Sequence, residues 1–130
     1  MATEPIEENP AADKSGFAKS VVVVNTGDGK GKSSSAFGVM VRGVARGWNI
    51  AVLQFIKSGE WNVGEEKIGV QLGVDWFNEG EGFTWDSDNI DHDKALAQQG
   101  WGHAATLIAA GQHELIILDE LTYLINWGWI

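Results

Sequence analysis

Short apolar runs alternate along the chain with segments of helical periodicity. Continuous runs dominated by apolar residues occur at Val21–Asn25, Asn49–Phe55, Val74–Phe77 and Glu114–Glu120. A strand buried on both faces of a parallel sheet has such a continuous apolar run, whereas a half-exposed strand alternates apolar and polar residues. The pattern therefore predicts buried strands at the first, second and fourth of these runs, and a short strand at Val74–Phe77.

The segments between these runs favour helices. Ser33–Arg46 carries apolar residues at helical spacing and stops before Gly47, and Glu65–Leu72 stops before Gly73. A longer helical pattern extends from Ser87, a plausible N-cap, to about Ala110. Strands that alternate with helices predict an α/β fold with a mainly parallel sheet and right-handed crossovers.

Length and composition narrow the class of protein. A chain of 130 residues fits one domain. We expect it at residues 20–130, after a mobile, acidic tail at residues 1–19 that carries both prolines.

The apolar runs are too short to cross a bilayer, the first residues do not resemble a secretory signal, and the chain has no cysteine. A cytoplasmic location is the default expectation, with no membrane partner. The net charge of −9 argues against nucleic acid as a partner.

The segment "NTGDGKGKSSSAFG", from Asn25 to Gly38, resembles a phosphate-binding loop. It nearly matches G-x-x-x-x-G-K-[ST], but Thr26 occupies the place of the first glycine. Glycines in a strand-to-helix turn let successive backbone N–H groups point into one concavity. Lys32 would then reach a terminal phosphate, and the Ser33 hydroxyl would bind Mg²⁺. A plain glycine-rich turn is the alternative, which the lysines and the following hydroxyl disfavour.

Two acids end the last predicted strand. Asp119 and Glu120 follow an apolar run, and a carboxylate at the carboxyl end of a strand can hold Mg²⁺ beside phosphates. Many strands end in acids, so the pattern alone is weak. Because parallel strands bring their carboxyl ends to the same edge of a sheet, we expect these acids near the glycine loop.

Aromatic residues in a glycine-rich loop form a third signal. The chain has seven tryptophans, and "GEGFTW" places Phe83 and Trp85 between turn residues. A broad apolar ligand would explain this placement, but so would a loop that folds onto the core, and the residues alone leave both open.

The triplet Asp91–Asp93 invites a metal interpretation, but consecutive helical residues point in different directions, so an exposed first turn explains it better.

Several of these stretches together resemble one family. The matching segments are "NTGDGKGKSSSAFG", Arg42, "VLQFIKS", "EWNVGEE", "GEGFTW" and "LDELTY". In this set and order they resemble the P-loop-type ATP:corrinoid adenosyltransferases, whose loop has the same shortened opening. The resemblance implies a P-loop (RecA-like) three-layer fold. It covers the chain from about Val21 onward.

The resemblance also implies an activity and its cofactors. Such enzymes transfer the 5′-deoxyadenosyl group of ATP to the Co(I) of cobalamin or a precursor corrinoid and release triphosphate. Mg²⁺ would be held by Ser33, Asp119 and Glu120. Phe83 and Trp85 match aromatics that pack beneath the corrin and displace its lower axial ligand, so with Lys32 they are the expected catalytic residues. The expected nucleotide-binding residues are Asn25, Thr26, Gly27, Asp28, Gly29, Lys30, Gly31, Lys32, Ser33, Ser34 and Arg42.

The chain departs from the family in length. Family members usually continue for several dozen residues beyond "LDELTY", so the resemblance implies a shortened chain that lacks C-terminal strands. The alternatives are a truncated ATP- or corrinoid-binding module without turnover, and a generic RecA-like ATPase that shares only the loop. The resemblance further implies a reductase that supplies the electron for Co(I), and a homodimer.

Overall fold

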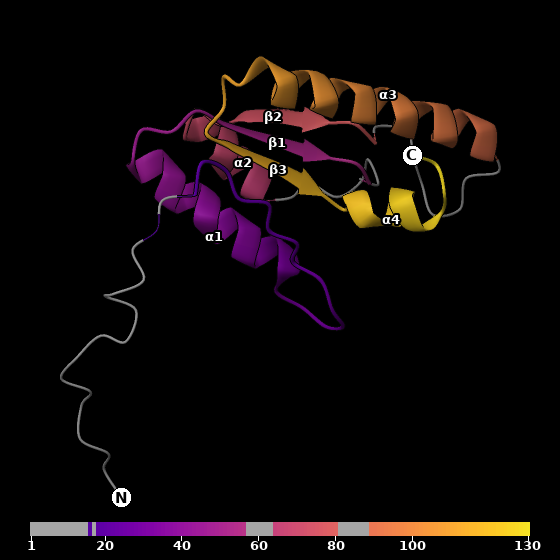
Figure 1. Cartoon of the computed structure of the whole chain (residues 1–130). Coiled ribbons are helices and arrows are strands. Elements are labelled where there is room, and N and C mark those ends of the chain that lie inside the picture. The colour runs from indigo at the N-terminus through magenta and orange to yellow at the C-terminus, as the bar shows by residue number, and fades with distance from the viewer. Residues whose placement is uncertain (1–15, 17, 57–63, 81–88) are drawn as a thin grey trace, which may run out of the picture.

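The computed structural model describes residues 16, 18–56, 64–80 and 89–130. Three parallel strands form one sheet in the order β2-β1-β3, with helices on either side (Figure 1). The elements in chain order are α1 (Lys32–Ala45), β1 (Ile50–Gln54), α2 (Gly64–Gln71), β2 (Asp75–Asn78), α3 (Ile90–Ala110), β3 (Leu115–Asp119) and α4 (Leu121–Asn126). The predicted α/β fold of the P-loop type, with its parallel sheet, is confirmed.

Strand β1 lies at the centre of the sheet and separates two apolar clusters. All five of its residues are buried, and successive side chains point to opposite faces. Ile50 and Val52 pack with residues of α1, whereas Ala51, Leu53 and the following Phe55 pack with residues of α3 and α4. The result is the expected three layers. Among the described residues, no helix is long and apolar enough to cross a membrane.

The prediction of a buried strand at Val21–Asn25 is wrong. This segment has no regular secondary structure, and the Val22 side chain is 91% exposed (Figure 1). An apolar run becomes a strand only where a neighbouring strand accepts its backbone hydrogen bonds. β1 already has a partner on each side, and Val21–Asn25 does not pair with the outer edge of β3, which stays open in the part of the chain that the structure describes. The other three predicted strands form, and β1 is buried as expected. The prediction of full burial is wrong for β3, which lies at the edge of the sheet and is half-buried apart from Ile117.

The start of α3 also differs from its prediction. Asn89 is the N-cap, and its side-chain oxygen accepts a hydrogen bond of 3.1 Å from the backbone N–H of His92. Ser87, the predicted cap, lies outside the described residues. Both residue types are good N-caps, so composition alone did not distinguish them. The helix ends at Gly111 in a left-handed conformation, as a C-terminal glycine commonly does.

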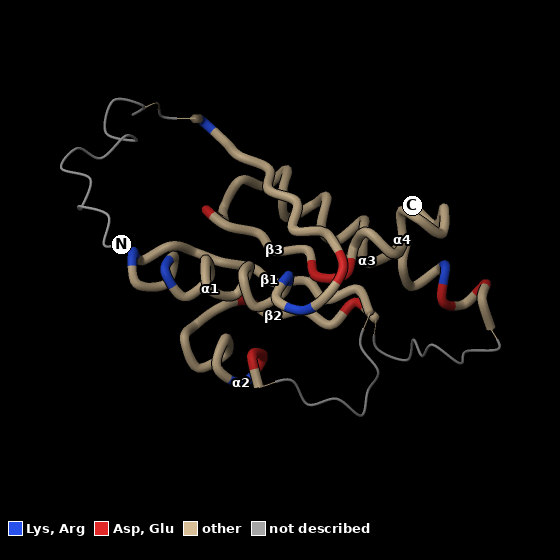
Figure 2. The backbone as a smooth tube through the Cα atoms, turned by 90° about the horizontal axis from the view of Figure 1, so that it is seen from below, with Lys and Arg blue, Asp and Glu red and all other residues tan. Residues whose placement is uncertain are grey.

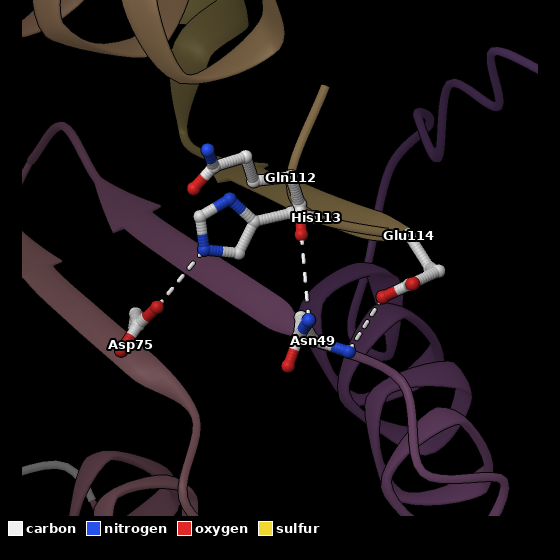
Figure 3. A network of polar contacts seen from close by, with 5 residues as sticks. All are labelled: Asn49, Asp75, Gln112, His113 and Glu114. Carbon is white, nitrogen blue, oxygen red and sulfur yellow. Dashed lines mark hydrogen bonds and ion pairs between the residues drawn. The ribbon is translucent and has the colours of Figure 1, made fainter. Parts of the chain in front are cut away.

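Polar contacts join the amino ends of the three strands (Figure 3). The backbone N–H of Asn49 donates to the Glu114 carboxylate at 2.6 Å, which joins the starts of β1 and β3. His113 Nε2 lies 2.9 Å from the Asp75 carboxylate, which joins β3 to β2. These contacts lie at the end of the sheet opposite the glycine loop, so we assign them to strand alignment.

Two glycines of α3 provide a matched test of helix–sheet packing. A Cβ added at Gly100 would lie 2.8 Å from the Cβ of Glu79, whereas one added at Gly102 would meet nothing within 4 Å. Gly100→Ala should therefore lower the free energy of unfolding by about 1–3 kcal/mol through overpacking. Gly102→Ala should raise it by about 0.5–1 kcal/mol through helix propensity. Urea unfolding measures both, and equal effects of the two substitutions would contradict the packing.

Candidate functional site

The glycine loop forms an open turn ahead of α1. Gly27, Gly29 and Gly31 have φ angles of 122°, 89° and 110°, which residues with a side chain rarely adopt. Gly31 is the N-cap of α1, and no side chain caps the helix. The first N–H groups of a helix have no partner within it and attract anions. The loop therefore offers backbone donors to a phosphate group.

The Lys32 ammonium group lies within this loop. Its Nζ donates to the carbonyl oxygens of Gly27 at 2.8 Å and of Gly29 at 2.6 Å. The Asn25 amide donates to the Lys32 carbonyl at 3.4 Å and links the two ends of the loop. The ammonium is thus held where the loop turns, and phosphate oxygens brought there can replace the two carbonyls as its partners. The role of Lys32 in binding a terminal phosphate stays a prediction.

A hydrogen bond connects the loop to the end of the sheet. The Ser33 hydroxyl donates to Asp119 Oδ1 at 2.8 Å, although 86 residues separate the two along the chain. Figure 2 shows acidic and basic positions close together in this region. The expectation that the loop and the carboxyl end of the last strand share one edge of the sheet is confirmed. Ser33 and Asp119 are both half-buried.

Glu120 has an unusual backbone and a perturbed carboxyl group. Its φ of 64° makes it the one residue other than glycine with a positive φ in the described part of the chain, and such strain is common at functional sites. Partial burial raises the pKa of the Glu120 carboxyl, the neighbouring Asp119 charge raises it further, and Lys32 opposes both. The residue as a whole remains exposed, so water screens these interactions.

The oxygen atoms of Ser33, Asp119 and Glu120 suit a magnesium ion, which prefers hard oxygen ligands. Among the described residues, no group of three or more His, Cys, Asp or Glu side chains is placed to hold a metal by itself. Mg²⁺ commonly combines one or two carboxylates with substrate phosphates and water. The residues present fit an ion that is bound together with a nucleotide.

The perturbed carboxyl predicts a pH effect on stability. A raised pKa in the folded state means that the folded protein binds more protons than the unfolded chain between the ordinary value of 4.5 and the raised value. Stability should therefore fall as the pH rises through that window, and Glu120→Gln should remove this contribution and be more stable at neutral pH. Urea unfolding of both proteins between about pH 4 and pH 8 measures the difference. Identical pH profiles would contradict it.

Arg42 lies apart from the cluster formed by Lys32, Ser33, Asp119 and Glu120. Arg42 is in the last turn of α1, about 15 Å along the helix axis from Lys32, and its role in nucleotide binding stays a prediction. Phe83 and Trp85 lie outside the described residues.

In the triplet at the start of α3, Asp91 and His92 are exposed, but Asp93 is buried. The expectation of an exposed first turn is therefore wrong for Asp93, because this residue faces the sheet side of the helix.

Two polar residues of the site were not predicted. Gln54 and Asn78 end β1 and β2 and lie in register with each other, and Gln54 also lies in register with Asp119. Gln54 donates to Asp119 Oδ2 at 3.3 Å, and Asn78 donates to Glu66 of α2 at 3.0 Å. The signal in the sequence is the same as for Asp119 and Glu120, namely a polar residue at the end of an apolar run.

The parallel α/β fold and the glycine loop that meets a strand-end carboxylate define a protein of the P-loop class. Comparison with known proteins specifies the class further. The family model ATP:corrinoid adenosyltransferase BtuR/CobO/CobP matches residues 18–130, and the chain belongs to this family. The predicted family is confirmed.

Three relatives carry the name corrinoid adenosyltransferase. The chain is 38% identical to the Escherichia coli K12 protein over 112 residues, which cover 86% of this chain and 57% of that protein. It is 37% identical to the Salmonella typhimurium protein, named corrinoid adenosyltransferase CobA, with the same two coverages. It is 40% identical to the Pseudomonas aeruginosa protein over 114 residues, which cover 86% and 56%. The chain thus spans somewhat more than half the length of these relatives.

Proposed function

We propose that this chain binds MgATP at the glycine loop and transfers the 5′-deoxyadenosyl group to the Co(I) of a corrinoid. The Co–C5′ bond forms with the two electrons of Co(I), the bond from C5′ to oxygen breaks, and triphosphate leaves with that electron pair. The contact between Ser33 and Asp119 carries the proposal, because it joins a phosphate loop to a metal-binding carboxylate in a member of this family. The site belongs to a domain that we place at residues 20–130.

The protein's contribution is to hold ATP and to stabilise the leaving group. The backbone donors of the loop and the Lys30 and Lys32 ammonium groups neutralise the triphosphate. Because cobalt is the nucleophile, the protein needs no nucleophilic side chain and acts by positioning and by excluding water. The position of Lys32 supports a role in stabilising the leaving group, because its ammonium already lies 2.6–2.8 Å from two loop carbonyl oxygens.

The magnesium ion, when bound, supplies positive charge to the phosphate oxygens. In the arrangement we propose, the Ser33 hydroxyl oxygen binds the ion directly. Asp119 accepts a hydrogen bond from the Ser33 hydroxyl, which leaves the hydroxyl lone pairs available for the ion. Glu120 provides the second carboxylate. Thr26, Asp28, Ser34 and Arg42 complete the proposed nucleotide contacts.

The corrinoid side of the proposal rests on Phe83 and Trp85. Bulky apolar groups beneath the corrin deny the cobalt a water or nitrogen ligand, and a cobalt ion without that ligand is easier to reduce to Co(I). We place this step in the cytoplasm, with a separate reductase as electron donor and a homodimer as the assembly. The net charge of −9 disfavours nucleic acid as a further partner.

An anaerobic assay tests the proposed function. The protein, MgATP and chemically reduced cob(I)alamin are mixed, and formation of adenosylcobalamin is followed by its absorption spectrum. Product that requires both ATP and protein is the expected result. Binding of MgATP without product would overturn the transferase proposal in favour of a binding module. Release of phosphate or ADP without adenosylcobalamin would favour a generic ATPase.

A further inference from the structure

A chain of hydrogen bonds crosses the sheet from Trp76 to Ser33. The Trp76 indole N–H donates to Gln54 Oε1 at 3.0 Å, and Gln54 Nε2 donates to Asp119 Oδ2 at 3.3 Å. Asp119 Oδ1 in turn accepts the Ser33 hydroxyl proton at 2.8 Å. Side chains from β2, β1, β3 and α1 thus meet in one network. Asp119 is its common acceptor, with one protein donor on each carboxylate oxygen.

The direction of each hydrogen bond in this network follows from which of its atoms can donate. An indole nitrogen can only donate a hydrogen bond, so the Gln54 oxygen must face Trp76 and its amide nitrogen must face Asp119. Gln54 is only 5% exposed, so water cannot readily substitute for either partner. The amide therefore presents a permanent N–H donor to one Asp119 oxygen, which favours one rotation of the Asp119 side chain.

Packing holds the far end of the network in place. The Trp76 ring lies 5.5 Å from the Phe37 ring of α1, centroid to centroid. The ring also lies against Gly69 of α2, where an added Cβ would come within 2.6 Å of the indole. The indole N–H is consequently directed at Gln54 by two helices, and Gln54 transmits this orientation to the metal-binding edge of the sheet.

We propose that Gln54 is a positioning residue for the magnesium site, acting through Asp119 on the Ser33 hydroxyl. When Gln54 holds one Asp119 oxygen, the other oxygen faces Ser33 and accepts a hydrogen bond from its hydroxyl. The Ser33 lone pairs then face the ligand side. Outer partners of this kind typically change metal affinity or activity by 10- to 100-fold, as an order of magnitude, when they are removed. The proposal rests on the proposed function for its ligand, MgATP.

The test is ATP binding, measured calorimetrically at a series of Mg²⁺ concentrations in the absence of corrinoid. Gln54→Glu is nearly isosteric and still accepts from Trp76, but it turns an oxygen toward Asp119 in place of the N–H donor. The Mg²⁺ concentration that gives half-maximal ATP affinity should rise about 10- to 100-fold. Gln98→Glu introduces the same charge on α3, where Gln98 donates to the Trp129 carbonyl, and should leave that concentration unchanged.

A second variant separates positioning from folding. Trp76→Phe keeps an aromatic ring beside Phe37 but removes the donor that fixes the Gln54 amide, so it should shift the Mg²⁺ dependence in the same direction by a smaller factor. Thermal unfolding shows whether each variant is folded. A purely structural role would lower the unfolding temperature and leave the Mg²⁺ dependence of the folded protein unchanged. If Gln54→Glu does not fold, Trp76→Phe decides the question.

The same experiments distinguish the proposed role of Gln54 from the proposed transferase activity. A folded Gln54→Glu protein whose Mg²⁺ dependence lies within about twofold of the wild type would overturn the role of Gln54. Wild-type protein that binds MgATP and forms no adenosylcobalamin would overturn only the transferase activity. Wild-type protein that does not bind ATP with Mg²⁺ would overturn both.

Discussion

Replacing Lys32 with alanine is expected to abolish measurable adenosyl transfer, with a loss of at least about 100-fold in kcat/KM. The Lys32 ammonium is already placed among the loop carbonyls of Gly27 and Gly29, and in the proposed reaction it faces the negative charge that accumulates on the leaving triphosphate. Two hydrogen bonds to backbone carbonyl oxygens fix this positive charge within the loop. The adenosylcobalamin assay measures the loss, and calorimetry measures the accompanying loss of ATP affinity.

Arg46→Ala is the matched control for Lys32→Ala. Arg46 is the C-cap residue of the same helix and is exposed, about 21 Å from Lys32 along the helix axis. Its replacement removes an equal charge from the far end of α1 and should leave transfer and ATP affinity unchanged. A Lys32→Ala protein that keeps wild-type ATP affinity would show that the loop does not bind phosphate as described.

Replacing Asp119 with asparagine should reduce the affinity for Mg²⁺ in the presence of ATP by about 100-fold. Gln54 can only donate toward position 119, so the new side chain must turn its oxygen to Gln54 and its NH₂ group to Ser33. The Ser33 hydroxyl then accepts a hydrogen bond where it previously donated one. Its lone pair is used within the protein, and one negative charge is also lost. The Mg²⁺ dependence of both ATP binding and transfer measures the effect.

Asp75→Asn serves as the control for Asp119→Asn. Asp75 lies at the opposite end of the sheet, where its carboxylate contacts His113, and its side chain is 59% exposed. The same chemical change there should leave the Mg²⁺ dependence at its wild-type value. Equal shifts in the two variants would mean that net charge, rather than the arrangement around Ser33, sets the affinity for the metal.

The parts of the site that sequence predicts depend on local signals and on one general property of parallel sheets. The glycines of the loop and the acids after an apolar run are visible without any structure. Their meeting follows because parallel strands end at a common edge, and the contact of Ser33 with Asp119 bears this out. The helix that begins at Lys32 was likewise evident from its spacing and from Gly47 beyond its end.

Other features depend on contacts between distant segments and could not be read from the sequence. The bonds of Gln54 require the register of β1 with both neighbouring strands, and no local pattern specifies a register. The Val21–Asn25 segment carries a strong strand signal but no neighbouring strand that pairs with it in the described structure. Side-chain preference describes how well a residue suits a sheet, whereas hydrogen-bonding partners determine whether the strand forms.

The unpaired outer edge of β3 has a practical consequence for handling the protein. In the described part of the chain, the backbone groups along this edge face no other strand, and Val21–Val24 exposes four β-branched side chains at 65–91%. An open strand edge and a solvent-exposed valine segment together can template β-pairing between molecules. Storage at high concentration should therefore favour self-association, and light scattering over a dilution series would indicate the concentration at which purified samples remain suitable for the binding experiments.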